Sequence, residues 1–376
     1  MDITLVILCA GESSRFRLEV KKQWLRVEDT PLWLNVTNRL STYYDFAKVI
    51  VVGHKDELNY MKNYSDDIEF VAGGSTRQSS VKNGLQFVTT PYVMITDVAR
   101  SCIPKDVIQN LISNREKASC IVPVLKASDT IVYENNTIDR DNVKIIQTPQ
   151  LSKTDILNKA LDTDVQFTDE SSAINSIDES VYYIDGSEQS RKLTFGDELK
   201  YISCLMKPSN DHFTGSGIDI HQFELNKQMV LGGVTIDSEF GFKAHSDGDV
   251  LIHSIIDALL GACGAGDIGE FFPDTDPKYK GADSKELLKH ILKFIKNVGY
   301  DIVNIDTTIM AQKPKINPYK NDIKLSLSKL LDIPKYKINI KATTGEKMGF
   351  IGRSEGVAVL SSATLKYTNW TNQWIY

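Results

Sequence analysis

Apolar runs and helical patterns alternate along the first part of the chain. Four continuous apolar runs predict buried strands, at residues 3–9, 48–53, 68–72 and 92–96. Helices are predicted between them, from Pro31 to Tyr43 and from Thr76 to Phe87. Strands that alternate with helices predict an α/β domain with a parallel sheet. Ligands bind at the carboxyl ends of strands in such sheets, so the loops after Cys9, Ala72 and Thr96 are candidate binding loops.

A polar stretch with Pro and Gly at residues 207–216 interrupts this pattern, after a helix-like segment DELKYISCLM. We place a domain boundary there, with one domain over residues 1–208 and another over residues 209–376. The second domain mixes strands and helices, which predicts an α/β (α+β) fold. Its strands are predicted at residues 217–223, 307–311, 337–343 and 357–367, and its helices at about 248–262, 284–298 and 318–331.

Bulk composition narrows the class of protein. The length of 376 residues fits two domains, and the hydrophobic fraction of 41% is ordinary for a globular chain. A net charge of −6 does not favour a general nucleic-acid surface, but it leaves room for local sites that bind phosphorylated small molecules. No apolar stretch approaches the length of a membrane span, and no positive region precedes the first apolar run. We expect a cytoplasmic protein that binds neither nucleic acid nor membrane.

The cysteines add a prediction about redox state. The chain has five, an odd number, widely spaced and without a CxxC pair. This pattern favours scattered reduced thiols over a disulfide framework.

The loop after the first strand carries chemistry suited to phosphate. Gly11 lets the backbone approach an anion closely, and the following N–H groups can form an anion nest. Arg15 and Lys22 can supply the positive charge that a triphosphate needs. The loop is not a Walker A motif. Taken alone, it is also compatible with an ordinary strand-to-helix turn that carries basic surface residues.

Two further strand ends point to the same edge of the predicted sheet. Gly73 and Gly74 follow the third strand, with Ser80 in the helix after them. Asp97 ends the fourth strand, with Arg100 three residues on. A carboxylate at that position could bind a metal ion carried by a nucleotide.

Together these motifs resemble the 2-C-methyl-D-erythritol 4-phosphate cytidylyltransferases over residues 3–206, a family with a Rossmann-like nucleotidyltransferase sheet. The resemblance implies CTP and a phosphorylated methylerythritol as substrates. It implies catalytic roles for Arg15, Lys22 and Arg140, the last at the acceptor phosphate. It assigns nucleotide binding to Ala10, Gly11, Gly74, Ser80 and Asp97, and acceptor binding to Thr148, Thr168 and Lys192, some of them across a dimer interface.

Three motifs depart from the pattern of that family. The first loop reads CAGESSRF where the family has a glycine-richer AAGxGxRM, and TDVARS stands for the usual HDAARP. The last motif reads QSRKLT where DNIKIT is common. The key charged positions are kept in all three.

The second domain carries a metal-ligand pattern. Asp219 and His221 are two apart on a predicted strand and therefore share one face. His253 and Asp257 share a face of the following helix. Two histidines and one carboxylate with an open fourth position are a catalytic zinc arrangement. We expect Asp249 or Asp257 to orient His253 through its other ring nitrogen. The alternative is that these histidines have only structural roles.

This segment, from Gly215 to Leu365, closely resembles the 2-C-methyl-D-erythritol 2,4-cyclodiphosphate synthases, a homotrimeric family. The resemblance implies Zn²⁺ at Asp219, His221 and His253 and Mg²⁺ or Mn²⁺ at Glu346, with a metal also at the first site. It makes His245 catalytic, beside Ser246 at the reacting phosphate. It assigns the cytidine pocket to Lys315, Thr343 and Thr344, and further substrate contacts to Asp267, Gly269, Phe350 and Arg353.

The two resemblances together predict one bifunctional enzyme of non-mevalonate isoprenoid synthesis, which needs a separate kinase between its steps. We expect trimeric C-terminal cores joined into a hexamer by N-terminal pairs. One alternative is a nucleotidyltransferase for another acceptor, such as a sugar phosphate, fused to a zinc phosphohydrolase. Another is a scaffold in which one half binds without catalysis.

Overall fold

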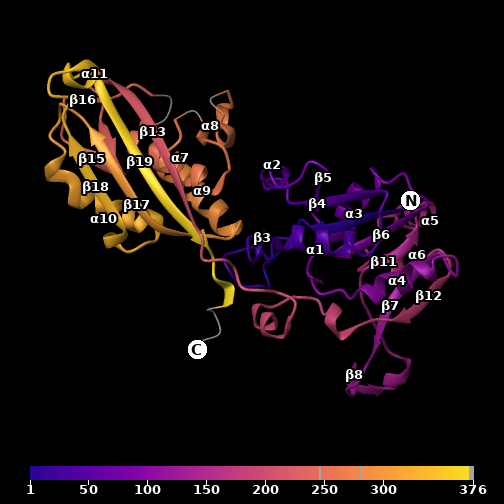
Figure 1. The fold of residues 1–376 in the computed structure, drawn as a ribbon. Helices are drawn as coiled ribbons and strands as arrows, with labels where there is room; N and C mark the ends of the chain where they lie inside the picture. Colours follow the sequence, from indigo (N-terminus) through magenta and orange to yellow (C-terminus); the bar gives the residue numbers. More distant parts are fainter. Residues whose placement is uncertain (245–246, 274, 280, 372–376) are drawn as a thin grey trace. The chain divides into compact units, whose positions relative to one another are not determined.

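The computed structural model describes residues 1–244, 247–273, 275–279 and 281–371. The chain forms two compact units (Figure 1). The first contains Met1–Pro208 together with residues 369–371, and the second contains Ser209–Thr368. The returning segment is attached to the first unit by Trp370, whose buried indole N–H donates to the carbonyl oxygen of Arg26 at 2.8 Å.

A mixed sheet forms the core of the first unit, in the order β10-β7-β11-β6-β1-β4-β5, with β12 paired to β7. Its strands are β1 (Ile3–Cys9), β4 (Lys48–Gly53), β5 (Glu69–Ala72), β6 (Tyr92–Asp97), β7 (Cys120–Lys126), β10 (Lys144–Ile146), β11 (Gln150–Lys153) and β12 (Val181–Asp185). The four strands predicted from apolar runs are parallel neighbours. The prediction of a parallel sheet does not extend to its other half, because β11 and β10 run antiparallel to their neighbours.

Helices cover this sheet and small hairpins lie outside it. The helices are α1 (Leu32–Ser41), α2 (Leu58–Lys62), α3 (Arg77–Leu85), α4 (Lys105–Ser113), α5 (Thr154–Leu161) and α6 (Glu170–Asn175), and the hairpins are β2 (Arg26–Val27) with β3 (Thr30–Pro31) and β8 (Ile131–Tyr133) with β9 (Asn136–Ile138). Thr76 caps α3 by accepting a hydrogen bond from the backbone N–H of Ser79 at 3.0 Å. Gly84 lets α3 approach β1 and β4, since a Cβ there would meet Val52 and Val6 at 3.0 and 3.2 Å.

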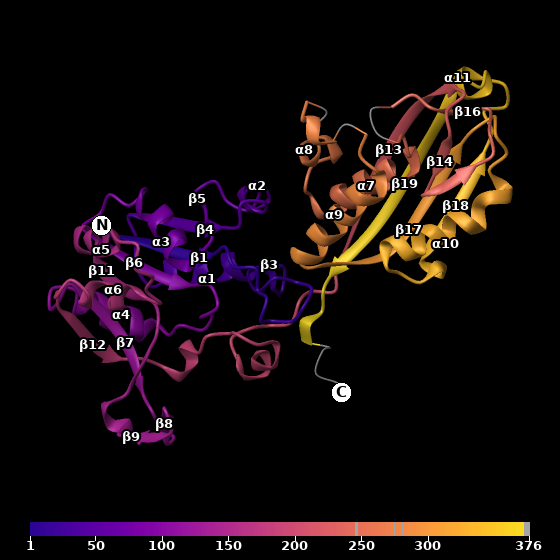
Figure 2. The same ribbon diagram turned by 180° about the vertical axis from the view of Figure 1, so that it is seen from behind.

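The second unit packs helices against a five-stranded sheet in the order β16-β13-β19-β17-β18. Its strands are β13 (His212–Leu225), β14 (Met229–Leu231), β15 (Val234–Ile236), β16 (Phe240–Phe242), β17 (Tyr300–Met310), β18 (Ile338–Thr343) and β19 (Gly356–Tyr367). Its helices are α7 (Val250–Cys263), α8 (Ile268–Phe271), α9 (Ser284–Asn297), α10 (Lys320–Leu331) and α11 (Gly349–Gly352). Helices α7, α9 and α10 lie on one face of the sheet (Figure 2).

Strand β13 alternates between two environments. Gly215 and Gly217 face α7 and are buried, while Ile218 and Ile220 face away and are exposed. A Cβ on Gly217 would lie 2.1 Å from the carbonyl oxygen of Ser254 in α7, so only glycine permits this close approach. The helix therefore packs directly on the strand that carries the predicted metal ligands.

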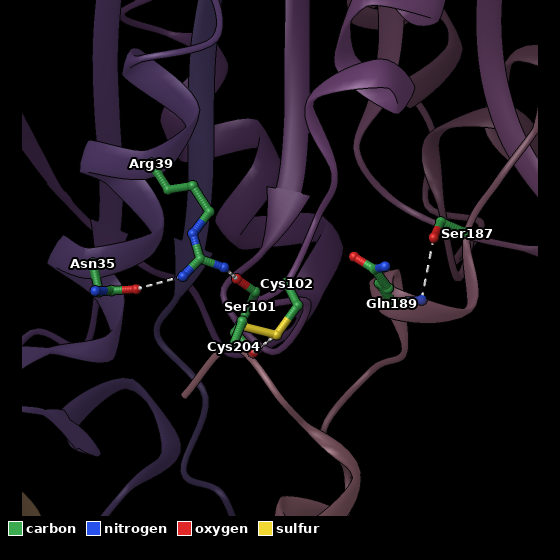
Figure 3. Close-up of a disulfide and its surroundings, with 7 residues drawn as sticks. All are labelled: Asn35, Arg39, Ser101, Cys102, Ser187, Gln189 and Cys204. Carbon is green, nitrogen blue, oxygen red and sulfur yellow. Dashed lines mark hydrogen bonds between the residues drawn. A yellow bond between two sulfur atoms is a disulfide. The ribbon is translucent and has the colours of Figure 1, made fainter. Parts of the chain in front are cut away.

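Two predictions about the end of the first domain are wrong. The helix expected in DELKYISCLM is only a 3₁₀ segment, Gly196–Tyr201. The cysteines are not all reduced, since Cys102 and Cys204 form a disulfide with a Cα–Cα distance of 5.7 Å (Figure 3). Their separation of 102 residues explains why spacing did not indicate the bond.

Within the described residues, no helix is both long enough and apolar enough to cross a membrane.

Candidate active sites

The glycine loops of the first unit meet at the carboxyl ends of β1, β4 and β5. A Cβ on Gly73 would lie 2.3 Å from the Cβ of Ala10, so a side chain at Gly73 would force the first loop away. The N–H of Gly73 donates to the carbonyl oxygen of Gly53 at 2.9 Å, and that of Gly74 donates to Ser80 Oγ at 3.1 Å. The structure thus brings the predicted nucleotide-binding loops together around Ala10.

Ser13 holds the first loop where the related family has glycine. Its φ of 55° lies in the left-handed region. Its carbonyl oxygen accepts from Phe16 N at 2.8 Å, and its hydroxyl accepts from Lys22 N at 3.0 Å. The Gln23 side chain donates to the carbonyl oxygen of Gly11 at 3.3 Å. The serine therefore keeps the turn and also fixes the backbone of Lys22.

The two adjacent lysines have different places. Lys21 is buried between Glu12 and Glu57, with its Nζ 2.8 Å from a carboxylate oxygen of each. Glu57 is buried as well and accepts from Trp24 Nε1 at 2.6 Å. Lys21 therefore stabilises the loop, whereas the side chain of Lys22 belongs to the candidate site.

Three cations converge beside the loop. Lys22 Nζ donates to the carbonyl oxygen of Leu193 at 3.2 Å, which places the lysine next to the last motif of the domain. Burial lowers the pKa of Lys22, and the nearby charges of Lys192 and Arg15 lower it further. Such a concentration of like charge is unfavourable by itself and is suited to a polyphosphate anion.

Asp97 lies at the end of β6, between the cations of Arg77 and Lys192. Its two oxygens are 3.0 Å from Arg77 Nε and 2.6 Å from Lys192 Nζ. Burial alone would raise the pKa of Asp97, but these two cations outweigh it and lower the pKa to about 2. Arg77 also binds Glu170 at 2.7 and 3.3 Å. The sequence motifs did not assign roles to Arg77, which binds Asp97, or to Glu170, which binds Arg77.

The predicted acceptor residues are only partly brought together. Thr148 is buried and accepts from Asp97 N at 3.3 Å. Thr168 is exposed, two residues before Glu170, and donates to Asp169 at 3.1 Å. Arg140 is exposed and donates to the carbonyl oxygen of Ser128 at 2.7 Å; among the described residues it has no hydrogen bond or ion pair to the Asp97 cluster.

The three predicted zinc ligands come together in the second unit. Strand β13 supplies Asp219 and His221, and helix α7 supplies His253. Asp219 Oδ2 lies 3.1 Å from His221 Nε2 and 3.2 Å from His253 Nδ1. One donor atom from each residue lies within 4.8 Å of the others, as a metal ion requires. Burial would raise the pKa of Asp219, but hydrogen bonds from the two histidines outweigh it and lower the pKa.

The remaining ring nitrogens of these histidines have partners that the sequence did not indicate. His221 Nδ1 lies 3.0 Å from the carbonyl oxygen of Gly248. His253 Nε2 lies 2.8 Å from Ser284 Oγ, so Ser284 takes the place expected for Asp249 or Asp257. Asp249 instead caps α7 by accepting from Ile252 N and also binds the N–H groups of Gly232 and Gly233, and Asp257 accepts from Ile268 N.

Other predicted residues of this unit lie around loops at the ends of its elements. Asp267 caps α8 and accepts from Gly269 N at 2.9 Å. The N–H of Ala311 donates to the carbonyl oxygen of Thr343 at 3.0 Å, which places the segment with exposed Lys315 beside Thr343. His245 and Ser246 lie outside the described residues.

Glu346 and the α11 residues stand apart from the three-ligand group. Glu346 accepts from Thr344 Oγ1 at 2.8 Å and is not a member of the metal-ligand group found among the described residues. Phe350 is exposed, and Arg353 pairs on the surface with Glu355 at 2.6 Å.

Comparisons with known proteins cover both units. The 2-C-methyl-D-erythritol 4-phosphate cytidylyltransferase family matches residues 3–207, and the YgbB family matches residues 212–366. A bifunctional enzyme IspD/IspF of Aliarcobacter butzleri is 66% identical, over 98% of this chain and 99% of the relative. One from Campylobacter curvus is 48% identical, over 99% and 100%. The structure of the bifunctional IspDF from Campylobacter jejuni matches with a TM-score of 0.90 and 47% identity, over 99% of this chain and 100% of that one.

Proposed function

Because the chain belongs to the bifunctional IspD/IspF enzymes, we propose residue roles for its two reactions. It is a cytidylyltransferase and a cyclodiphosphate synthase of isoprenoid biosynthesis. The first activity transfers CMP from CTP to 2-C-methyl-D-erythritol 4-phosphate with release of pyrophosphate. The second cyclises 4-CDP-2-C-methyl-D-erythritol 2-phosphate to the 2,4-cyclodiphosphate with release of CMP. The alternatives of another acceptor and of a non-catalytic scaffold are thereby set aside.

For cytidylyl transfer, the proposal rests chiefly on the convergence of Arg15, Lys22 and Lys192. The acceptor phosphate is already an anionic nucleophile, so the site must align it and neutralise charge. Arg15 and Lys22 would neutralise the triphosphate as the bond to the α-phosphorus forms and the bond to pyrophosphate breaks. Ala10, Gly11, Gly74 and Ser80 would hold the nucleotide, and Thr148, Thr168 and Arg140 the acceptor, with Arg140 reaching the site of a partner subunit.

Asp97 could hold Mg²⁺ or Mn²⁺ only through one of its oxygens. Its partner Arg77 is also bound to Glu170, whereas the side chain of Lys192 is 39% exposed. The oxygen that faces Lys192 is therefore the one that a divalent cation could take. Such a cation, when bound, would neutralise charge on the nucleotide phosphates.

For cyclisation, the proposal rests on Asp219, His221 and His253, whose nitrogen and oxygen donors suit Zn²⁺. The donor set fits, because the Gly248 carbonyl oxygen accepts from the distal nitrogen of His221 and leaves the other nitrogen unprotonated. Zinc, when bound, supplies Lewis-acid polarisation of a phosphate oxygen. Lys315, Thr343 and Thr344 would hold the cytidine, and Asp267 and Gly269 the erythritol hydroxyls.

The remaining roles in this unit are carried by residues outside the three-ligand group. His245 and Ser246 would contact the reacting phosphate, and Glu346 would bind a second divalent cation. Phe350 and Arg353 would belong to the substrate and subunit contacts around α11.

A homo-oligomer is proposed from two exposed apolar surfaces. Ile218 and Ile220 on β13 are 60% and 52% exposed, and Leu360 on the paired β19 is 43% exposed, which is suited to a trimer of the second unit. Val132 and Tyr133 on the β8–β9 hairpin are more than 60% exposed and are suited to pairing of the first unit. Light scattering should give the mass of six chains; a monomer would contradict the proposal. We also propose a cytoplasmic location, where CTP is made.

Phosphorus NMR of the full chain tests the assigned roles. With Mg²⁺, CTP and 2-C-methyl-D-erythritol 4-phosphate, pyrophosphate and a CDP-alcohol signal are expected. With Zn²⁺, Mg²⁺ and the CDP-alcohol 2-phosphate, CMP and a cyclic diphosphate are expected. Asp219→Ala should stop only the second reaction. If Asp219→Ala cyclises its substrate as the natural protein does, the proposed metal site is wrong.

A further inference from the structure

A buried serine connects His253 to Asp247, which is not a member of the metal-ligand group found among the described residues. Ser284 is the first residue of α9 and is wholly buried. Its Oγ lies 2.8 Å from His253 Nε2 and 2.5 Å from Asp247 Oδ1. The backbone N–H of Ser284 also donates to the second oxygen of Asp247 at 3.2 Å. Asp247 therefore holds Ser284 at both its hydroxyl and its backbone.

The directions of these hydrogen bonds follow from the donor set. His253 Nδ1 is the nitrogen that lies beside Asp219 Oδ2, so it must be unprotonated to bind a metal ion. The ring proton of the neutral imidazole is then on Nε2 and is donated to Ser284 Oγ. Because a carboxylate only accepts, the Ser284 hydroxyl donates to Asp247. The chain of donors runs in one direction, from His253 through Ser284 to Asp247.

His221 is held differently. Its distal nitrogen donates to a backbone carbonyl oxygen, that of Gly248, which no substitution of a side chain removes. The orientation of His253 depends on two side chains, that of Ser284 at the beginning of α9 and that of Asp247 in the loop before α7. Asp247 Oδ1 also accepts from Asp249 N at 3.2 Å, so the same carboxylate joins the beginnings of α7 and α9.

We propose that Ser284 and Asp247 are positioning residues that fix the tautomer and ring orientation of His253 for metal binding. This inference rests on the proposed metal site at Asp219, His221 and His253. Partners of this kind typically change metal affinity by about 10–100-fold when they are removed.

The test compares zinc affinity among variants of the full chain, by competition with a chelating dye. Ser284→Ala is expected to weaken zinc binding by about 10–100-fold. Ser254→Ala is the matched control, because Ser254 is equally buried and adjacent to His253, but its hydroxyl contacts Ser361 Oγ at 2.7 Å. It should bind zinc within about 3-fold of the natural chain, well inside the effect expected at Ser284.

Cobalt substitution distinguishes a positioning role of Ser284 from a general loss of stability. The visible absorption of bound Co²⁺ reports ligand geometry, so it should change in Ser284→Ala and stay unchanged in Ser254→Ala. Ser284→Thr, which keeps the hydroxyl, should restore both the spectrum and the affinity. Asp247→Asn provides a second variant that preserves size, with an expected loss of about 10-fold, and it decides the question if Ser284→Ala does not fold.

The outcomes distinguish this inference from the metal site itself. If the natural chain binds no stoichiometric zinc, the proposed metal site fails, and the positioning role fails with it. If the natural chain binds zinc and Asp219→Ala does not, the site stands. The positioning role is then overturned if Ser284→Ala and Asp247→Asn both keep the natural affinity and cobalt spectrum.

Discussion

Replacing Arg77 with Met should test how the first site is held together. Arg77 neutralises two carboxylates that are almost wholly out of water, since Asp97 is 8% exposed and Glu170 is 2% exposed. Methionine keeps much of the side-chain length and removes the charge. Both carboxylates would then remain buried, with only Lys192 still bound to Asp97.

The size of the effect follows from two estimates. Removing one partner of a buried ion pair typically costs about 3–5 kcal/mol, because the other partner stays buried without compensation. Separately, lowering the pKa of Asp97 from 3.8 to about 2 corresponds to about 2 kcal/mol of stability at neutral pH. Lys192 contributes part of the lowered pKa of Asp97, and the Arg77→Met variant retains Lys192. We therefore expect the free energy of unfolding to fall by about 3 kcal/mol at pH 7.

The pH dependence of the stability loss provides an independent test of this account. In the natural chain the lowered pKa of Asp97 contributes stability that is present above pH 3.8 and is lost as the pH falls toward about 2. Burial already raises the pKa of Glu170 despite Arg77. In the variant the pKa values of both carboxyls rise, so the folded state takes up protons more readily than the unfolded state. The stability deficit should therefore shrink as the pH is lowered from 7 to 5.

Urea unfolding followed by tryptophan fluorescence measures this deficit. No tryptophan lies in residues 209–368, and Trp24, Trp33 and Trp370 belong to the first unit, so these three report on its unfolding. Adding Glu170→Gln to Arg77→Met removes one of the stranded charges and should restore about 1–2 kcal/mol. A deficit below about 1 kcal/mol, or one that does not change between pH 7 and 5, would refute this account of Arg77.

Three further predictions address the separate parts of the chain. Lys22→Ala should lower the rate of CMP transfer, measured by pyrophosphate release, by about 10²–10³-fold. Cyclisation should stay unchanged because the two sites lie in different units, and loss of both activities would contradict independent sites. Gly217→Ala should destabilise the second unit by about 1–3 kcal/mol or more, because its Cβ would lie 2.1 Å from the carbonyl oxygen of Ser254, and circular dichroism on heating should show the loss. Cys204→Ser should lower the free energy of unfolding by up to the roughly 4–5 kcal/mol expected for a closed loop of this length, and so lower the urea midpoint. Reductant should lower the midpoint of the natural chain to the same value, and equal midpoints without reductant would argue against the bond.

Elements with strong local patterns were predictable from the sequence. The run at residues 3–9 became β1 with every residue buried, because a central strand of a covered sheet is apolar on both faces. The helix from Ser284 to Asn297 was found because its apolar positions repeat on one face and Asp283 caps its start. The 3₁₀ segment Gly196–Tyr201 was mistaken for part of a helix because ten residues of mixed pattern do not determine how many turns form.

Strand direction and covalent pairing were less accessible. Residues 150–153 pair with β6 and β7 in the antiparallel sense, which depends on the path of the preceding chain. Cys102 and Cys204 meet only after the chain has passed through half of the sheet. Neither relation leaves a local mark in residue type or spacing, so neither could be predicted from one sequence.

The same distinction explains which site residues the sequence indicated. Asp219 and His221 share a strand face, so two-residue spacing was enough to predict that they act together. The residues that hold other site residues in place come from distant segments: Ser284 lies 31 residues from His253, and Glu170 lies 93 residues from Arg77. The residue type of such a positioning residue also gives no signal, since a serine at the start of a helix or a glutamate in a short helix can have many structural roles. Such a residue is recognised by its buried hydrogen bond to a site group that must keep one charge or one tautomer. This hydrogen bond forms only after the chain has folded, so the sequence alone does not show it.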